Sequence, residues 1–343
     1  MKVIIGIDPH KQGHTAVAIN SKEKELARVR VRATRRQVEQ LRRWAESFSP
    51  RVWAIESASG LGYLLAQQLV AVGEQVMDVP PTLASRVRLL GNGQTNKNDP
   101  NDSRSVAVAA LRAPGLARVQ QADHVAVLRL LAKRNLDIGR ARNRTACRLH
   151  ALLCDVAPGG IAQEMSVQKA KRLLETARPG TAVETTRMAL AYELVDDLER
   201  LDEQLKAMKR RITDALVASK TTLTELFGVG PIVACLAVGY SGDMARFASR
   251  HDYAAYNGTA PVEMSSGGRV AHRLSRRGNR RLNYAIHMAA VAQIRHLDSE
   301  GRAYFDRKIA EGKTKMEALR ALKRRVSDAV YRQLVLDAER RQG

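Results

Sequence analysis

The order of short strand-like runs at the start of the chain constrains its fold most strongly. "KVIIGID" (2–8) is a continuous apolar run that ends in an acid, and "HTAVAIN" (14–20) alternates as a second strand. The intervening "PHKQG" is a turn sequence, so the two runs predict a β-hairpin. "LARVRVRA" (26–33) alternates strictly, which predicts a third strand at the edge of the sheet.

Helical and strand patterns then alternate. A helical spacing over 35–48 precedes a strand-like run at 51–57, and a helix at 61–73, closed by glycine, precedes another strand at 74–80. Three antiparallel strands followed by strand–helix–strand units is the order of an RNase H-like α/β domain. The sequence therefore predicts such a domain over residues 1–118.

The chain becomes helical after this domain. Residues 124–156 form one long helical pattern studded with arginine, and 166–178 form a shorter one. In 184–219 apolar residues recur at three- and four-residue steps with mixed charges between them. This pattern predicts a helical hairpin in a coiled-coil middle region, 119–220, that is able to pair with another chain. A helical stalk within one chain is the alternative.

A third, mostly α-helical domain is predicted over 221–343. It begins with "GVGP" (228–231) between two helical patterns, which resembles a helix–hairpin–helix element. In such an element the backbone amides of the glycine turn meet a phosphate. A tight turn between two packed helices needs the same residues, so both interpretations stay open.

The charge of the chain indicates its class of partner. It carries 57 Lys and Arg residues against 35 Asp and Glu, a formal net charge of +22. Clustered basic side chains neutralise phosphates and release counterions, so we expect a nucleic-acid partner rather than a merely soluble basic surface. Aromatic residues make up only 4% of the chain, so base stacking is not expected to dominate that binding.

Sequence features also bear on compartment and cofactor. The apolar run at the N-terminus is too short for a signal peptide, and no run reaches the ~18–20 residues of a membrane span. Cys147, Cys154 and Cys235 show no paired spacing, which argues against disulfides or zinc and for a reducing cytoplasm. A Walker A motif is absent, so ATP is not implicated.

Four acids occupy positions that carry chemistry in RNase H-like domains. Asp8 closes the first strand, Glu56 ends the fourth, and Asp99 and Asp102 open the next helix. Converging carboxylates raise one another's pKa unless a cation neutralises them, and oxygen ligands suit Mg²⁺ or Mn²⁺. Two such ions are able to hold the attacking and leaving oxygens of a phosphodiester. As alternatives, these acids are turn residues or helix caps.

The segments "IGID", "IES" and "NKNDPNDSR", which carry these acids, resemble the DEDD-type insertion-sequence transposases, relatives of the Piv DNA invertase. The resemblance covers nearly the whole chain. It implies a RuvC-like N-terminal domain, a coiled-coil middle, and a C-terminal transposase domain. It also implies that the four acids hold a divalent metal at DNA.

The C-terminal part of the resemblance rests on "GTAPVEMSSGGRVAHRLSRRGNRRLNYAIHMA". Gly258 and Pro261 match the family pattern, and Ser266 falls at the position of its nucleophile. The match implies that Ser266 attacks a DNA phosphate and forms a covalent phosphoserine; Ser265 is an adjacent competitor. A cluster of arginines follows, which would grip phosphate and stabilise a pentacovalent transition state: Arg269, Arg273, Arg276, Arg277, Arg280 and Arg281.

The resemblance also implies partners. These are donor and target DNA, a structured noncoding bridge RNA as guide, and further copies of the chain in a homodimer or homotetramer. In that assembly the acids of one subunit lie beside the serine of another. The arginine-rich stretch 129–148 suits an RNA partner, although composition does not separate RNA from DNA. We expect a prokaryotic, cytoplasmic and nucleoid-associated protein.

The sequence leaves three functions open. The first is a transposase that performs metal-assisted, serine-mediated strand exchange without ATP. The second is a RuvC-like nuclease or Holliday-junction resolvase, which would use the same four acids, make Ser266 dispensable and leave no covalent adduct. The third is a non-enzymatic nucleic-acid-binding protein whose acids are only caps and turns.

Overall fold

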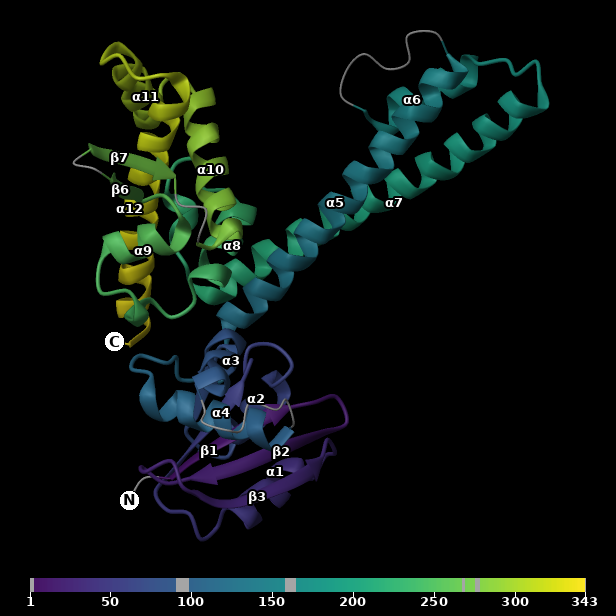
Figure 1. Ribbon diagram of the computed structural model, residues 1–343. Helices are drawn as coiled ribbons and strands as arrows, with labels where there is room; N and C mark the ends of the chain where they lie inside the picture. Colours follow the sequence, from purple (N-terminus) through teal and green to yellow (C-terminus); the bar gives the residue numbers. More distant parts are fainter. Residues whose placement is uncertain (1–2, 91–98, 158–164, 267–268, 275–277, 343) are drawn as a thin grey trace. The chain divides into compact units, whose positions relative to one another are not determined.

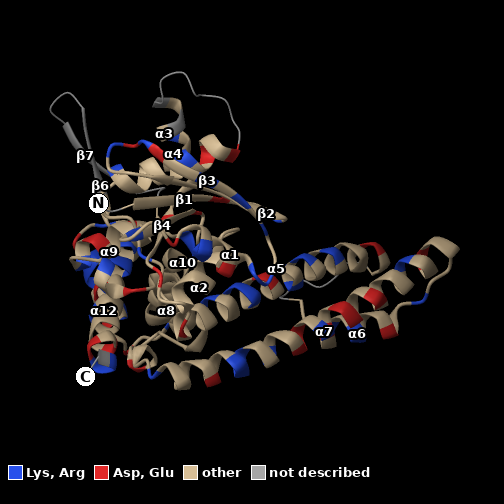
Figure 2. Ribbon diagram, turned by 90° about the horizontal axis from the view of Figure 1, so that it is seen from below, with Lys and Arg blue, Asp and Glu red and all other residues tan. Residues whose placement is uncertain are grey.

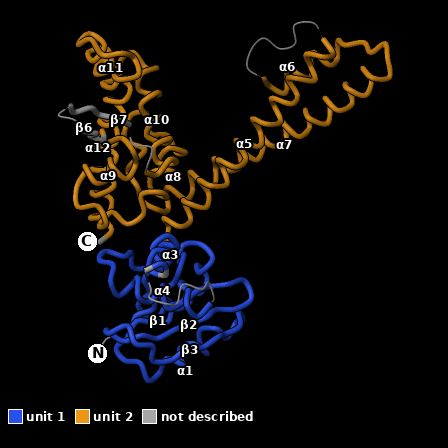
Figure 3. Tube along the Cα trace, viewed as in Figure 1, with its two compact units in different colours: residues 1–122 blue, residues 123–343 orange. Residues whose placement is uncertain are grey.

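The structure is a computed structural model that describes residues 3–90, 99–157, 165–266, 269–274 and 278–342. At 88, 90, 262–266, 269–274 and 342 it describes the main chain alone. The chain divides into two compact units, Met1–Ala122 and Asp123–Gly343 (Figure 3). Among the described helices, none combines the length and the apolar character that a membrane span requires.

Within the described part of unit 1, five strands form one sheet in the order β3-β2-β1-β4-β5 (Figure 1). β1 pairs antiparallel with β2 and parallel with β4, while β2–β3 is antiparallel and β4–β5 parallel. The five strands are those predicted from the sequence, with the third at an edge of the sheet, and the mixed α/β character of the domain is confirmed. The strands are β1 (Val3–Pro9), β2 (Gly13–Ile19), β3 (Glu25–Arg32), β4 (Arg51–Glu56) and β5 (Val76–Val79).

Two layers of helices cover the sheet, because its central strands are apolar on both faces. Ile5 and Ile7 contribute to one buried cluster, together with Leu41 of α1 and Leu65 of α2. Ile4, with residues of α3 and α4, contributes to the other. α3 was not predicted from the sequence. The helices are α1 (Gln37–Trp44), α2 (Tyr63–Ala71), α3 (Pro81–Leu90) and α4 (Asp99–Arg112).

Gly6 allows α4 to lie directly on the sheet. A Cβ atom built on Gly6 would stand 2.1 Å from the main-chain oxygen of Ser103 and 2.8 Å from Cβ of Ala107. Any side chain at residue 6 would therefore push the helix away from β1. Because α4 is seated on β1, its first turn lies near the carboxyl end of that strand.

Unit 2 is built on a long helical hairpin. α5 and α7 pack along one another, and each is continuous (Figure 1). The segment 184–219 is therefore one helix and not a hairpin by itself; it contains neither Gly nor Pro, and its partner within this chain is α5. Arg142 of α5 forms an ion pair with Asp202 of α7. The helices are α5 (His124–Val156), α6 (Val167–Thr176) and α7 (Ala182–Ser219).

The remaining helices of unit 2 bury a core with the base of this hairpin. Cys235 of α8, Ile286 of α10 and Val326 of α12 belong to one buried cluster with Leu128 of α5 and Ile212 of α7. The elements are η1 (Leu223–Glu225), α8 (Pro231–Ser241), η2 (Met244–Arg246), α9 (Arg250–Asn257), β6 (Pro261–Ser266), β7 (Arg269–Leu274), α10 (Arg280–Arg295), α11 (Glu300–Ala310) and α12 (Lys315–Gln342).

The glycine turn before α8 packs on a helix. Gly228 has a φ of 83°, and a Cβ there would stand 2.7 Å from the main-chain oxygen of Ala289 in α10. Pro231 is the first residue of α8, where its missing N–H costs no hydrogen bond. Close packing therefore accounts for Gly228, in agreement with a tight turn between two packed helices.

Candidate active site

Two of the four predicted acids lie at the ends of neighbouring parallel strands. β1 and β4 pair with Ile7 opposite Ile55, and the next residue on each strand is an acid, Asp8 and Glu56. Side chains alternate along a strand, and both isoleucines belong to the cluster under α1 and α2. The two acids therefore belong to the face that α4 covers. Asp8 is buried, only 7% exposed, and Glu56 is half-buried.

The other two acids, Asp99 and Asp102, lie in the first turn of α4. The buried hydroxyl of Ser103 donates to the main-chain oxygen of Thr15 at 2.9 Å. Thr15 is paired in register with Asp8, so this bond holds the start of α4 over the end of β1. Because α4 begins at Asp99, Asp102 lies inside the helix. Asp102 is therefore not the N-cap of α4, which was the alternative role for this acid.

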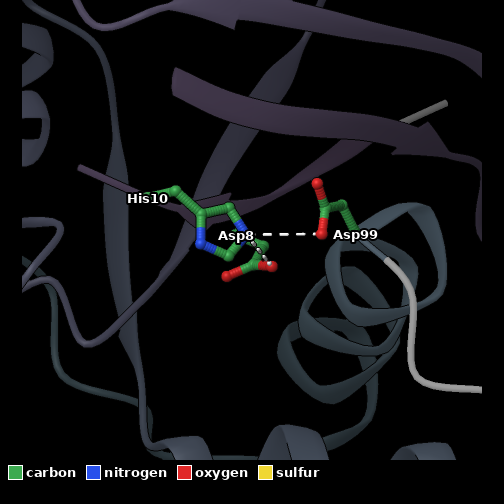
Figure 4. Close-up of side chains that lie close together, drawn as sticks. All are labelled: Asp8, His10 and Asp99. Atoms are coloured by element: carbon green, nitrogen blue, oxygen red, sulfur yellow. Dashed lines mark ion pairs between the residues drawn. The ribbon is translucent and has the colours of Figure 1, made fainter. Parts of the chain in front are cut away.

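A histidine that sequence reasoning did not assign joins this cluster. The Nε2 atom of His10 lies 3.0 Å from Oδ2 of Asp8 and 3.5 Å from Oδ1 of Asp99. Figure 4 shows the imidazole ring on one side of the two carboxylates, with this nitrogen facing both. Arg30 of β3 approaches Asp99 from a greater distance, 3.8 Å. Arg30 thus offsets part of the charge of Asp99, and a ring nitrogen of His10 lies within reach of both carboxylates.

The electrostatics of Asp8 reflect this crowding. Burial raises the pKa of the Asp8 carboxyl above its ordinary value, and the negative charges of Asp102 and Asp99 raise it further. His10 opposes both effects through its charge and its hydrogen bond. The sensitivity of Asp8 to Asp99 and Asp102 indicates that the three carboxylates act on one another at this sheet edge.

The donor atoms of this cluster fit a divalent cation. One carboxylate oxygen each from Asp8 and Asp99 and a ring nitrogen of His10 all lie within 4.8 Å of one another. Carboxylate oxygens are the donors that Mg²⁺ and Mn²⁺ prefer, and an imidazole nitrogen favours a transition metal such as Mn²⁺ over Mg²⁺. A cation here would also relieve the mutual repulsion that raises the pKa of Asp8.

The predicted nucleophile lies in unit 2, on a hairpin that the sequence did not predict. Ser266 is the last residue of β6 and is paired in register with Arg269, the first residue of β7; Ser265 is paired with Val270. The strand pairing thus places the main chain of Ser266 directly opposite that of an arginine.

The predicted arginine cluster extends from this hairpin into a helix. Arg269 and Arg273 belong to β7, and Arg276 and Arg277 lie outside the described residues. Arg280 and Arg281 begin α10. Arg281 donates to the hydroxyl of Tyr240 at 2.7 Å, so its guanidinium has a fixed position.

The role of His10 had only a faint sequence signal. It follows Asp8 by two residues in a turn, and the direction of a turn side chain depends on the loop conformation. The four acids had a stronger signal because each stands at the end of a predicted strand or at the start of a predicted helix. Their positions therefore followed from local pattern alone.

Two profiles of known protein families match the chain. One, for DEDD transposases of the IS110 type, is described as "Transposase" and matches residues 5–158. The second is described as "Transposase IS116/IS110/IS902 family" and matches residues 220–306. The first profile covers all four acids, and the second covers Ser265, Ser266 and the arginine cluster.

Individual relatives cover nearly the whole chain. An uncharacterized protein of insertion element IS116 from Streptomyces clavuligerus is 26% identical over 97% of this chain and 94% of its own length. A protein of insertion element IS900 from Mycobacterium paratuberculosis is also 26% identical, over 96% of this chain and 94% of its own length. The transposase for insertion sequence element IS1328 of Yersinia enterocolitica is 25% identical over 76% of this chain and 75% of its own length.

Among solved structures, T. thermophilus RuvC in complex with a Holliday junction substrate is similar to part of this chain. The match covers 35% of this chain and 100% of the RuvC chain. The sequence identity is 18% and the TM-score 0.28. The two family profiles and the relatives agree with one another over most of the chain. The chain therefore belongs to the IS116/IS110 family of transposases and is a DNA transposase.

Proposed function

We propose that this transposase cleaves and exchanges DNA strands with two sets of groups, the acids at the sheet edge of unit 1 and Ser266 of unit 2. The proposed role of the acids is supported by the convergence of ligand atoms from Asp8, His10 and Asp99, which all lie within 4.8 Å of one another. Asp8 is buried with the charges of Asp99 and Asp102 acting on it, an arrangement that a bound cation would stabilise.

The residues that would hold the metal are Asp8, Asp99, Asp102 and Glu56, with His10 beside them. Bound Mg²⁺ or Mn²⁺ would supply positive charge at the scissile phosphate and lower the pKa of a coordinated hydroxyl. The chain itself contributes the placement: β1 and β4 fix Asp8 and Glu56, and the bond from Ser103 to Thr15 fixes the start of α4. We propose that all four acids are required for cleavage.

Ser266 is proposed as the nucleophile. Its Oγ attacks the phosphorus, a bond from Oγ to phosphorus forms, and the bond from phosphorus to one deoxyribose oxygen breaks. The hydroxyl proton passes to a base, and the leaving oxygen accepts a proton. The number of phosphoester bonds is unchanged, so a hydroxyl-ended strand can reverse the step without ATP. Arg269, paired with Ser266 across the hairpin, is a candidate to stabilise the charge of the transition state.

The partners proposed are those of the family resemblance. Donor and target DNA are the substrates, and a bridge RNA is the proposed guide. We propose a homodimer or homotetramer in which the acids of one subunit serve the serine of another. The net charge of +22 supports a polyanionic partner of either kind.

The test is a search for a covalent adduct. The full chain is incubated with its flanking DNA, the guide RNA and Mg²⁺ or Mn²⁺, and an SDS-resistant protein–DNA species is isolated. Its modified peptide is then mapped. We expect the adduct on Ser266, its loss in Ser266→Ala, and its retention in Ser265→Ala, the matched control.

Two results would overturn parts of the proposal. Metal-dependent cleavage with no adduct would assign the chain to hydrolysis by a resolvase-like mechanism, with Ser266 dispensable. An adduct that persists in Ser266→Ala and disappears in Ser265→Ala would move the nucleophile to the neighbouring serine.

A further inference from the structure

A basic groove in unit 2 lies between three helices that are distant in the sequence. α5, α7 and α10 line a space of about 1040 Å³. Pockets for small molecules usually measure about 300–1,000 Å³, so this groove is at least as large as such a pocket. None of the four predicted acids is among the described residues of its lining.

The charge of the lining is strongly positive. Arg140 and Arg144 come from α5, and Arg280 and Arg281 from the first turn of α10. Asp137, the single acid of the lining, pairs with Arg140 at 3.4 Å. In the described part of the chain no carboxylate pairs with Arg144 or Arg280. Lys and Arg recur along α5 beyond this groove (Figure 2).

Positive charge at the α10 end of the groove is also uncompensated. Lys323 of α12 donates to Oδ1 of Asn283 at 2.8 Å. Burial lowers the pKa of the Lys323 ammonium, and the charge of Arg280 lowers it further. Cations that repel one another at a groove are the arrangement that a bound polyanion stabilises.

A buried acceptor in the wall narrows the class of ligand. Asn135 is 8% exposed and lines the groove, and its Oδ1 atom has no hydrogen-bond partner among the described residues. A buried acceptor without a partner is costly and rare in native proteins. Phosphate oxygens do not donate a hydrogen bond at neutral pH, whereas a base amino group or a ribose hydroxyl does. A nucleotide satisfies both the arginines and this oxygen.

We propose that this groove binds a nucleic-acid strand, with its phosphates on the arginines and a sugar hydroxyl or base amino group donating to Oδ1 of Asn135. Tyr284, 46% exposed in the same lining, offers a face on which a base stacks. The site rests on the nucleic-acid partners proposed above and not on the covalent step. It shares Arg280 and Arg281 with the predicted arginine cluster, so its test uses Arg140, Arg144 and Asn135, which lie outside that cluster.

Binding of the full chain is measured by fluorescence anisotropy, without divalent metal, over a series of salt concentrations. The probes are single-stranded RNA and single-stranded DNA of one sequence. Each phosphate contact contributes roughly 0.7 to the salt slope for a single strand, so the double variant Arg140→Gln, Arg144→Gln is expected to reduce the slope by about 1.4. The matched control, Arg210→Gln, Arg211→Gln, removes the same charge from exposed positions of α7 outside the lining and is expected to preserve the slope.

A second variant tests the acceptor. Asn135→Leu keeps the branched shape and the number of side-chain heavy atoms and removes the unpartnered oxygen. We therefore expect a higher melting temperature of the free protein together with about tenfold weaker binding at an unchanged salt slope. A larger loss with RNA than with DNA assigns the donor to the ribose hydroxyl, and an equal loss assigns it to a base. Equal slopes in the two double variants, or an unchanged affinity in Asn135→Leu, would overturn the proposal.

Discussion

The main-chain oxygen of Ser103 approaches Gly6 so closely that a Cβ atom on residue 6 would stand only 2.1 Å from it. This contact sets the distance between α4 and the sheet. Along β1, Asp8 follows Gly6 by two residues, and along α4, Asp99 precedes Ser103 by one turn. The same contact therefore brings the two carboxylates to one place.

Gly6→Ala is expected to lower the free energy of unfolding by about 1–3 kcal/mol, because α4 must move away from β1 to admit the methyl group. It should also weaken binding of Mn²⁺, since Asp99 moves with the helix. Urea denaturation and calorimetric titration measure the two effects. Gly139→Ala is the control: nothing lies within 4 Å of its Cβ position in α5, so stability should be unchanged or rise by about 1 kcal/mol. Equal stabilities for the two variants would contradict the packing argument.

The raised pKa of Asp8 predicts a pH-dependent stability. In metal-free protein the folded state binds the Asp8 proton more tightly than the unfolded chain does, so this residue favours folding at low pH. That contribution is lost as the pH rises from the unfolded value through the raised folded value. Metal-free Asp8→Asn should therefore be more stable than the parent protein at neutral pH, and the difference should vanish in acid. Added Mn²⁺ should stabilise the parent protein alone; stabilisation of both would place the metal elsewhere.

His10→Ala tests the imidazole as a metal ligand. Its Nε2 atom lies close to both Asp8 and Asp99, and a nitrogen donor matters more to Mn²⁺ than to Mg²⁺. We expect affinity for Mn²⁺ to fall by about tenfold and affinity for Mg²⁺ to fall less. Isothermal titration calorimetry without nucleic acid measures both constants. The control is His296→Ala in unit 2, and equal losses for the two metals would exclude His10 as a ligand.

Glu56→Ala and Asp102→Asn should separate catalysis from binding. Loss of a metal ligand removes several kcal/mol of transition-state stabilisation, so recombination should fall by at least about 10³-fold. Affinity for DNA and RNA should persist, because the basic surface is unchanged. Recombination is counted on a reporter plasmid and binding is measured by gel shift. A comparable loss of binding would count against the metal site, and full activity in Asp102→Asn would favour a non-enzymatic role for the acids.

A mixing experiment addresses the proposed assembly. Asp8→Asn and Ser266→Ala are each expected to be inactive alone. If acids and serine act from different subunits, the mixture restores recombination, because one mixed pair combines intact acids with an intact serine. Activity is measured at several mixing ratios, with each variant alone as the control. No activity at any ratio would confine the two sets of groups to one chain.

Local pattern was sufficient for much of this molecule. The helix predicted over 124–156 is α5 (His124–Val156), whose start is defined by the side chain of Asp123 accepting from the amide of Val125. Asp8 and Glu56 were identified at the ends of predicted strands, and Asp99 and Asp102 at the start of a predicted helix. The β6–β7 hairpin was not predicted, since "SSGG" and the arginines after it have the composition of a loop rather than of paired strands.

Features built by distant packing had no such signal. His10 meets Asp99 only because α4 is seated on β1, and their separation in the sequence hides the contact. Asn135 and Arg280 share a groove although 145 positions separate them (280 minus 135). Periodicity identifies the buried face of one helix but not which helix covers it, so sites of this kind require the folded chain.

The α5–α7 hairpin has a hydrophobic core at each end, one around Leu128 and Ile212 and the other around Leu153 and Val195. The 33 residues of α5 span about 50 Å, so the two cores are joined by a long helical segment. One residue inserted into each helix would turn the outer core by about 100° relative to the inner one. An insertion or deletion that preserves both cores must therefore add or remove whole turns. A change of about seven residues in each helix, or two turns, would move the outer core by about 10 Å and rotate it only slightly.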